Sequence, residues 1–376
     1  MKAVTPTIKN IIMADTQKSD RLVSLDFFRG LTMFLLIAEF THLFKYLVAP
    51  EFEGTFIYDF GMQFHHVKWE GMHFWDLIQP FFMFIVGVAI PFSYANRIKK
   101  GAAYKDIRNH AFKRALLLLF LGWWLYCQGP GKIVFRFQNV LAQLSVTYLI
   151  AFLIMRKPAI YQIAVSVAMI LISEIIYRTF SVEGFDQPWV NGHNFGYWLN
   201  AKISGQEYNS SWAIFNAIPT TAHTVWGALA GQLLMSKRSN KQKLQILIIA
   251  GLAGLAIGYG FSGVTPIIKR IATSTFVFAS GGWAFLALAL SYWIIDMKKL
   301  QKGVWIFTIV GLNPLFIYLF AHVGGAGLVS EIVVPLTNTL LGGNELLSHI
   351  VLSLIVLYLL WYICYWMFKN KIFIRI

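Results

Sequence analysis

Long runs of apolar residues alternate with short polar or basic segments along the whole chain. Ten of these runs are near the length of about 20 residues that an α-helix needs to cross the hydrocarbon of a bilayer. The pattern therefore predicts an all-α fold, a polytopic transmembrane helix bundle of about ten spans. The predicted spans are 28–48, 75–95, 112–128, 138–155, 159–180, 212–236, 244–262, 272–296, 304–323 and 345–368.

A further apolar segment, 324–338, is short and is interrupted by Gly and Pro residues, so it is either a re-entrant piece or an eleventh span. The loops help to decide, because cytoplasmic loops of membrane proteins carry an excess of Lys and Arg. With the N-terminus inside, the inside segments hold 23 basic residues and the outside segments hold 8. This asymmetry predicts an even number of spans with both termini in the cytoplasm.

Composition favours the same class of protein. The chain has 376 residues, of which 57% are hydrophobic and 13% are charged, and a soluble domain of this size cannot bury so much apolar side chain. The lipid bilayer is the predicted partner. A net charge of +15 does not indicate nucleic acid here, because the basic residues lie in short loops between apolar runs.

The chain shows no internal repeat and no linker. We therefore expect a cytoplasmic N-terminal tail at 1–22 and a single transmembrane domain at 23–376. The tail is polar and lacks the apolar core of a signal peptide, and the loops are compact. These features predict a multi-pass protein of a bacterial inner membrane.

Histidines, carboxylates and a tryptophan are concentrated directly before the second predicted span. A histidine near its ordinary pKa of about 6.5 can act as a general base or a nucleophile at neutral pH. His66 is the candidate, and Asp76 can orient its imidazole as a carboxylate does in a catalytic triad. The alternative is an interfacial His and Trp cluster that only anchors a helix. No His or Cys spacing matches a standard metal motif, so we expect no metal.

Other polar groups fall within predicted spans, where a charge is costly unless it is paired or faces a cavity. Asp26 and Arg29 have i,i+3 spacing, so they can pair, or Arg29 can face an anionic ligand. Glu39 is either functional or paired. Asn313 and His322, each taken alone, are better explained by hydrogen bonding between helices than by catalysis.

Two loops carry further signals. The basic loop 97–114, which includes Arg114, has two possible interpretations. Its charge either only reflects a cytoplasmic location or binds the phosphates of a nucleotide-like cofactor. No glycine-rich phosphate-binding motif accompanies it. The outer segment 181–211 is rich in Asn, Gly, Trp and Tyr, which suit either sugar binding or an interfacial aromatic belt.

An ordered set of motifs makes the chain similar to a known family. The motifs are Ser24-Leu25-Asp26-Phe27-Phe28-Arg29-Gly30-Leu31-Thr32, His66-Val67-Lys68-Trp69-Glu70-Gly71, Phe84-Ile85-Val86-Gly87, Ile218-Pro219-Thr220-Thr221, Gly227-Ala228-Leu229-Ala230-Gly231, Pro266-Ile267-Ile268-Lys269, Gly311-Leu312-Asn313 and Lys369-Asn370-Lys371-Ile372-Phe373. The chain resembles the heparan-α-glucosaminide N-acetyltransferase family, in particular its shorter bacterial members.

The resemblance implies a polytopic enzyme that takes acetyl from cytoplasmic acetyl-CoA, its co-substrate. The acceptor would be the amino group of a glucosamine or glucosaminide, a small amino sugar or glycan end, on the periplasmic side. The resemblance also implies that His66 is catalytic, with Asp76 orienting it. On this reading, the substrate-binding candidates are Trp69, Glu70, Lys269, Asn313, His322 and Glu39, and the candidates for binding acetyl-CoA are Arg29 and Arg114.

Two other functions remain open at this point. An O-acyltransferase of cell-envelope glycans would use the same histidine but acetylate hydroxyl groups. A transporter of amino sugars is the second, although such transporters often show internal repeats that this chain lacks. The sequence leaves a homodimer open.

Overall fold

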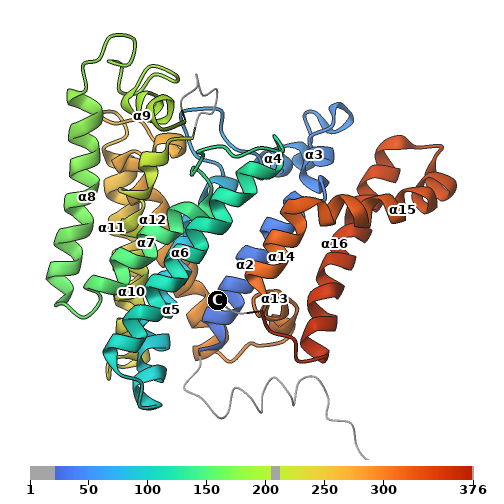
Figure 1. Cartoon of the computed structure of the whole chain (residues 1–376). Helices are drawn as coiled ribbons and strands as arrows, with labels where there is room; N and C mark the ends of the chain where they lie inside the picture. Colours follow the sequence, from blue (N-terminus) through green and yellow to red (C-terminus); the bar gives the residue numbers. More distant parts are fainter. Residues whose placement is uncertain (1–21, 205–211, 375–376) are drawn as a thin grey trace, which may run out of the picture.

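The computed structural model describes residues 22–204 and 212–374, and every regular element within these ranges is helical (Figure 1). The α-helices are α2 (Val23–Glu39), α3 (Leu43–Leu47), α4 (Phe56–Met62), α5 (Ile78–Lys99), α6 (Tyr104–Gln128), α7 (Val140–Ile154), α8 (Ala159–Thr179), α9 (Phe195–Ser204), α10 (Thr221–Met235), α11 (Asn240–Gly260), α12 (Ser274–Ser291), α13 (Val304–Val310), α14 (Pro314–Phe320), α15 (Ala326–Leu341) and α16 (Glu345–Lys369). Short 3₁₀ turns are η1 (Pro50–Phe52), η2 (Phe74–Leu77), η3 (Ile214–Ala217) and η4 (Lys269–Ile271), and the π-helical turns are η5 (Tyr292–Met297) and η6 (Ala321–Gly325). The all-α class is confirmed.

Six helical stretches in the described part of the chain are long and apolar enough to cross a membrane. They are Phe74–Lys99, Ala159–Thr179, Asn240–Gly260, Ser274–Met297, Pro314–Leu341 and Glu345–Lys369. Helix α7 is also apolar but shorter. The protein is therefore an integral membrane protein, whereas the predicted number of about ten spans stays a prediction.

Two predicted spans differ from the observed helices. The first, predicted at 28–48, is a helix that already ends at Glu39. His42 then adopts a left-handed backbone conformation with φ of 61°, which separates α3 from α2. The chain tightens at this end, because the backbone N–H and the hydroxyl of Thr41 both donate to the Ala38 carbonyl, three residues earlier.

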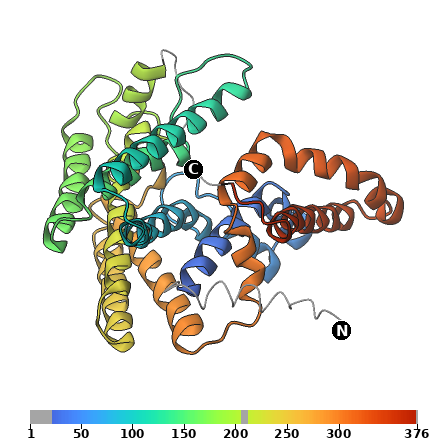
Figure 2. The ribbon, with the colours of Figure 1, turned by 60° about the horizontal axis from the view of Figure 1, so that its bottom comes forward.

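The predicted span 304–323 is broken in its middle. Helix α13 ends before Gly311, and α14 starts at Pro314. The residue before a proline is pushed out of the helical region, and Asn313 accordingly has φ of −127° and ψ of 50°. A second bend at Gly324, where φ is 102°, turns the chain into α15. The segment 324–338 is thus largely α15, which extends sideways from the bundle and pairs with α16 (Figures 1 and 2).

Glycines bring the central helices into backbone contact. A Cβ at Gly87 of α5 would overlap the Thr224 carbonyl of α10, and a Cβ at Gly227 of α10 would overlap the Phe84 carbonyl of α5. Small residues allow such close approach of helices in membranes, where packing rather than water drives association. Helix α5 is therefore held firmly at the centre of the bundle.

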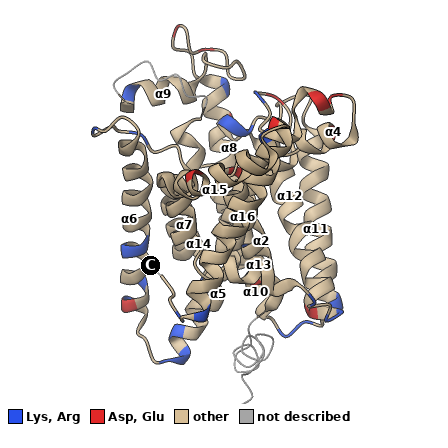
Figure 3. Cartoon of the chain, turned by 90° about the vertical axis from the view of Figure 1, so that its right-hand side faces the viewer, with Lys and Arg blue, Asp and Glu red and all other residues tan. Residues whose placement is uncertain are grey.

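Charged side chains gather toward the two ends of the helices, and the middle of the bundle is mostly uncharged (Figure 3). Helices α5, α7 and α10 end at one face, where α6, α8 and α11 begin (Figure 1). Basic residues dominate that face, which we call the basic face. It includes Arg97, Lys99, Arg156 and Lys237. The loop before α5, which contains His66, lies at the opposite face.

Candidate active site

The structure brings His66 and Asp76 into direct contact. His66 lies in the loop between α4 and η2, and Asp76 is the third residue of η2. The Nδ1 atom of His66 is 2.8 Å from Oδ1 of Asp76. The Asp76 side chain is only 2% exposed, whereas that of His66 keeps 33% exposure, so the imidazole stands between the buried carboxylate and the surface.

Local capping fixes the Asp76 carboxylate. Its Oδ2 atom accepts the backbone N–H of His73 at 3.0 Å and that of Val67 at 3.4 Å. A carboxylate at the third position of a helical turn that accepts the N–H of the cap residue forms half of a capping box. Because Oδ2 is used in this way, Oδ1 is directed to His66.

Lys269 completes the cluster from a distant part of the chain. Its Nζ atom is 3.2 Å from His66 Nδ1 and 3.4 Å from Asp76 Oδ1, and its side chain is 7% exposed. We call these three residues the His66 cluster. Lys269 opens η4, a turn held by the Thr273 hydroxyl, which accepts from the Ile268 N–H and donates to the Pro266 carbonyl.

Burial and charge set the protonation of the cluster. Burial lowers the pKa of His66 below its ordinary value; the hydrogen bond with Asp76 opposes this shift and the nearby Lys269 charge adds to it. Burial also lowers the pKa of Lys269 to about 8, even though Asp76 favours the ammonium form. At neutral pH the imidazole is therefore neutral and the lysine mostly protonated.

The tautomer of His66 decides what the cluster can do. Nδ1 can donate to Asp76 or accept from Lys269, but it cannot do both at once. When Nδ1–H donates to Asp76, the lone pair lies on Nε2. That nitrogen can then accept a proton or attack a carbonyl carbon, as the histidine of a carboxylate–histidine pair does.

Trp212 covers the cluster, and the sequence reasoning missed it. Its ring meets the His66 ring edge-on with centroids 5.6 Å apart, and the Lys269 ammonium lies 5.2 Å from its centroid. The Arg270 guanidinium is 5.4 Å from the same ring. Asn200 of α9 anchors this position by donating to the Trp212 carbonyl at 2.8 Å. The hydropathy pattern predicts Trp212 as the first residue of a span, but α10 begins only at Thr221.

Trp69 and Glu70 follow His66 in the same loop, but Trp69 makes a hydrogen bond to another loop and Glu70 faces outward. The Trp69 indole N–H donates to the Trp189 carbonyl at 2.6 Å, and its ring packs on a small cluster that includes Ile268. Trp69 therefore ties the His66 loop to the loop between α8 and α9, which is a structural role that the sequence did not predict for it. The Glu70 side chain is exposed.

Glu39 and His322 lie toward the same face as the cluster. The negative charge of Glu39 is near enough to favour the protonated forms of both His66 and Lys269, as a minor contribution beside burial. The His322 ring packs on Phe40 and Tyr318, with centroids 5.6 Å from each. The fold thus brings the charge of Glu39 near the His66 cluster, whereas His322 packs against aromatic rings.

The remaining candidates lie elsewhere. Arg29 pairs with Asp26 at 2.7 Å and donates to the Gly311 carbonyl at 3.0 Å, so the predicted i,i+3 pair forms. Asn313 donates to the Ile372 carbonyl and accepts from the Ile374 N–H, which fastens the C-terminal segment beside the break between α13 and α14. This use explains the burial of Asn313 without a substrate.

Arg114 of α6 is the candidate cation with an unused donor. Its guanidinium stacks on the Tyr148 ring of α7 at 4.8 Å from the centroid. Its Nε atom is buried and has no hydrogen-bond partner in the described part of the protein. A buried unsatisfied donor costs about 1–3 kcal/mol, so an anionic group at this place would be stabilised.

The fold and the site define a helical integral membrane protein with a histidine–aspartate–lysine cluster at one face. Comparison with known proteins then gives the family. Residues 21–259 match the model of the family described as heparan-alpha-glucosaminide N-acetyltransferase, catalytic. The chain belongs to this family. His66 and Asp76 lie inside the matched range, and Lys269 lies beyond it.

Two curated relatives carry the name heparan-alpha-glucosaminide N-acetyltransferase. The human protein is 23% identical over 95% of this chain and 60% of its own length. The mouse protein is 29% identical over 145 residues, which are 36% of this chain and 20% of that protein. The chain thus spans about 60% of the length of the human relative and a fifth of the mouse one.

Proposed function

We propose that this protein is a membrane acetyltransferase that moves acetyl from acetyl-CoA to the amino group of a glucosamine or glucosaminide. The observation that carries the proposal is the His66 cluster, within a chain of the N-acetyltransferase family. A neutral imidazole oriented by a buried carboxylate is the group that acyl transfer to an amine needs.

The proposed arrangement puts the nucleotide end of acetyl-CoA at the basic face, taken as cytoplasmic, with both chain termini on that side. The pantetheine arm would reach along the helices and present the thioester near His66. The excess of basic residues there supports this orientation. Arg114 has a buried donor that finds no partner among the residues the structure describes, and it is the best candidate to hold a phosphate. The acceptor would approach the opposite face, taken as periplasmic in a bacterial inner membrane, where Trp212 offers a ring for a sugar face.

In direct transfer, the amine attacks the thioester carbonyl carbon. A C–N bond forms, the C–S bond breaks, and His66 Nε2 takes the proton that the amine releases. That proton then passes to the departing CoA thiolate. Asp76 orients His66 and stabilises the imidazolium, and the Lys269 ammonium would stabilise the negative charge that develops on the carbonyl oxygen.

In the second route, His66 itself attacks the thioester. CoA then leaves before the amine attacks the acetyl-imidazole, which gives ping-pong kinetics. The same three residues serve both routes. Trapping labelled acetyl on the protein in the absence of acceptor distinguishes them, because only the second route holds acetyl covalently.

The test uses purified protein with radiolabelled acetyl-CoA and glucosamine. We expect labelled N-acetylglucosamine from the native chain, and a decrease of about 10²–10⁴-fold in His66→Ala, the range that a general base contributes. His349→Ala is the matched control and should retain full activity, because His349 lies at the start of α16 and stacks on Tyr46.

Each other outcome has a definite meaning. Full activity in His66→Ala would refute the assigned role of the histidine. Acetyl transfer to hydroxyl groups of glycans, but not to amines, would support an O-acyltransferase. Uptake of amino sugar into vesicles, without any binding of acetyl-CoA, would support a transporter.

A further inference from the structure

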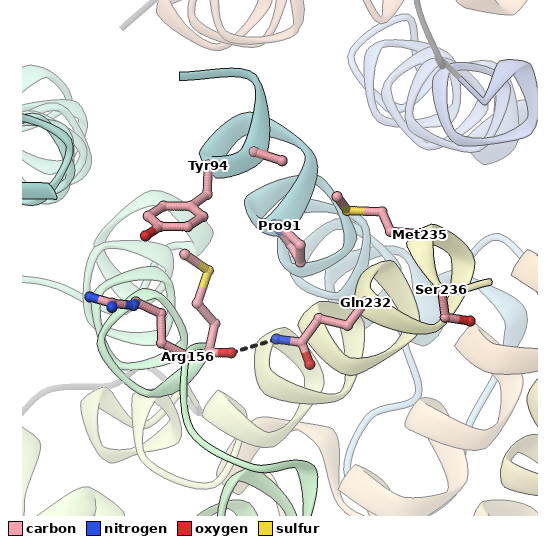
Figure 4. A pocket seen from close by; sticks show the side chains of 8 residues that line it. Pro91, Tyr94, Arg156, Gln232, Met235 and Ser236 are labelled. Carbon is pink, nitrogen blue, oxygen red and sulfur yellow. Dashed lines mark hydrogen bonds between the residues drawn. The ribbon is translucent and has the colours of Figure 1, made fainter. Parts of the chain in front are cut away.

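A second candidate site lies at the basic face, away from the His66 cluster. A pocket of about 410 Å³ opens between the ends of α5, α7 and α10 (Figure 4). Its lining consists of Pro91, Tyr94, Ala95, Met155, Arg156, Gln232, Met235 and Ser236. Figure 4 shows Tyr94 and Arg156 at one side of the pocket, with Pro91 and Met235 opposite them.

The pocket is separate from the His66 cluster. Helix α5 runs from Ile78, two residues after Asp76, to the pocket at Tyr94, a distance of about 24 Å along the helix. Between the two sites, α5 and α10 are in backbone contact at Gly87 and Gly227, so the pocket does not continue inward between these helices. The pocket is therefore a separate site and not part of the acceptor site at the His66 cluster.

The polar wall of the pocket is organised. The Gln232 amide donates to the Met155 carbonyl and its oxygen accepts from Gln162, so the turn after α7 is fixed to α10. The Arg156 guanidinium stacks on the Tyr104 ring, 4.4 Å from the centroid. In the described part of the chain its N–H groups make no hydrogen bond or ion pair, so they are available to an anion in the plane of the guanidinium.

Charge around the pocket is predominantly positive. The segments 86–105, 150–165 and 229–245, which form and flank the pocket, contain no Asp or Glu, and the acidic Asp106 follows directly in the first turn of α6. They hold ten basic residues, which are Arg97, Lys99, Lys100, Lys105, Arg156, Lys157, Lys237, Arg238, Lys241 and Lys243. A concentration of Lys and Arg at the end of membrane helices attracts anionic headgroups.

The other walls are apolar and continue onto the outer surface of the bundle. Met155 and Pro91 line the inner part of the pocket and are buried, whereas Met235 is 43% exposed and carries the apolar wall to the surface. Nearby, Leu153 and Ile160 also present exposed apolar side chains at the same helix ends. A soluble anion would use only the cationic side, whereas an amphiphile with a phosphate and an acyl chain matches both sides.

We propose that this pocket binds one anionic phospholipid of the adjacent leaflet, with its phosphate on Arg156 and an acyl chain along Met155 and Met235. Phosphate forms strong paired hydrogen bonds with a guanidinium, and the stacking on Tyr104 holds that guanidinium in place. The lipid would join the ends of α5, α7 and α10, and so add to the Gln232 bond between α7 and α10 and to the packing of Gly231 against Pro91 of α5.

The experiment titrates purified, delipidated protein in detergent with dioleoyl phosphatidylglycerol, or with dioleoyl phosphatidylcholine, and counts bound lipid by native mass spectrometry. We expect one tightly bound phosphatidylglycerol and no equivalent phosphatidylcholine. Arg156→Gln should weaken this binding about fivefold, the contribution of one cation at an anionic headgroup. Ala95→Phe, which fills the pocket without changing charge, should also remove it.

Lys302→Gln is the control, because Lys302 is exposed in the loop before α13 and does not line the pocket. It should bind phosphatidylglycerol like the native chain. Equal binding of the two lipids, or no effect of Arg156→Gln and Ala95→Phe, would overturn the proposal. Displacement of the lipid by acetyl-CoA, lost in Arg156→Gln, would also overturn it and make the pocket a donor site.

Discussion

Two long apolar helices of this protein each begin beside a carboxylate that faces a histidine. Asp76, just before α5, contacts His66 at 2.8 Å, and Glu345, the first residue of α16, lies 3.6 Å from His349. The two pairs are chemically alike but differ in enclosure, since the side chain of Asp76 is 2% exposed and that of Glu345 is 91% exposed. Only the first pair is held by capping bonds and joined by a lysine.

The helices that carry these pairs differ in the same way. Within the apolar stretch of α5, 61% of the residues are buried inside the protein, against 22% for α16. Both stretches are apolar enough to span a bilayer, so the difference is one of position and not of composition. A charged group is expensive where water is excluded, and it persists there only with partners that make it useful. The buried pair is therefore the candidate for chemistry.

The largest expected effect tests the packing that encloses α5. Gly227→Val would drive a side chain into the Phe84 carbonyl of α5. Overpacking of this kind costs about 1–3 kcal/mol or more, and backbone cannot yield as a flexible side chain does. We expect little monodisperse protein from detergent extraction, measured by size-exclusion chromatography.

Gly260→Val, at the end of α11, is the matched control. A Cβ there meets nothing within 4 Å, so yield and thermal transition should stay close to those of the native chain. Equal behaviour of the two variants would show that the close approach of α5 and α10 is not needed for folding.

The next effect concerns the carboxylate itself. Asp76→Asn keeps the shape and can still accept the capping N–H groups, but it loses the charge that stabilises an imidazolium. We expect acetyl transfer to fall by about 10²–10⁴-fold with folding preserved. The acid limb of the pH–rate profile should also move to lower pH, because Asp76 opposes the lowering of the His66 pKa.

Glu345→Gln makes the same chemical change at the exposed pair and should leave both rate and pH profile unaltered. A comparable loss of activity in both variants would contradict the contrast between the two pairs. A loss in Asp76→Asn without any shift of the pH profile would indicate a purely structural role.

The smallest expected effect is the pH dependence set by Lys269. Activity should rise as pH increases through the lowered pKa of His66, because the neutral imidazole is the base. It should fall again above a pH of about 8, where the buried Lys269 loses its proton. Lys269→Met should abolish this alkaline decline and reduce the plateau by roughly tenfold or more, the loss of one stabilising charge near the reacting oxygen.

Lys45→Met, at an exposed position of α3, is the control for the loss of a lysine at the same face. Its pH–rate profile should match that of the native chain. An alkaline decline that persists in Lys269→Met would assign that limb to another group, such as the amine of the acceptor.

Much of the site could be anticipated from local sequence. Asp76 is ten residues from His66 at the mouth of an apolar run, which is close enough for a turn and a cap to join them. Lys269 is different, since 203 residues separate it from His66. The sequence makes Lys269 a candidate for substrate binding. Nothing in the sequence predicts that its ammonium contacts both His66 Nδ1 and Asp76 Oδ1.

Trp212 shows a second reason why sequence reasoning stops short. By hydropathy, Trp212 belongs to the predicted span 212–236. In the structure it lies before α10, which begins at Thr221, and Asn200 holds it by donating to its carbonyl. In the same way, an apolar run alone did not reveal that 304–323 breaks at Asn313. The non-helical backbone of Asn313 before Pro314 causes this break, and a hydropathy pattern contains no information on backbone conformation.

The sequence by itself determined the class of this protein: apolar runs of membrane-spanning length dictate helices, because a bilayer leaves no other partner for backbone hydrogen bonds. It also determined the family and the local pairing of His66 with Asp76. The tertiary structure alone decided which apolar helices lie inside, because hydropathy is nearly the same for helices that face lipid and helices that face each other. Close packing at glycines places these helices inside the bundle. Contacts between distant loops bring Lys269 and Trp212 to His66 and Asp76.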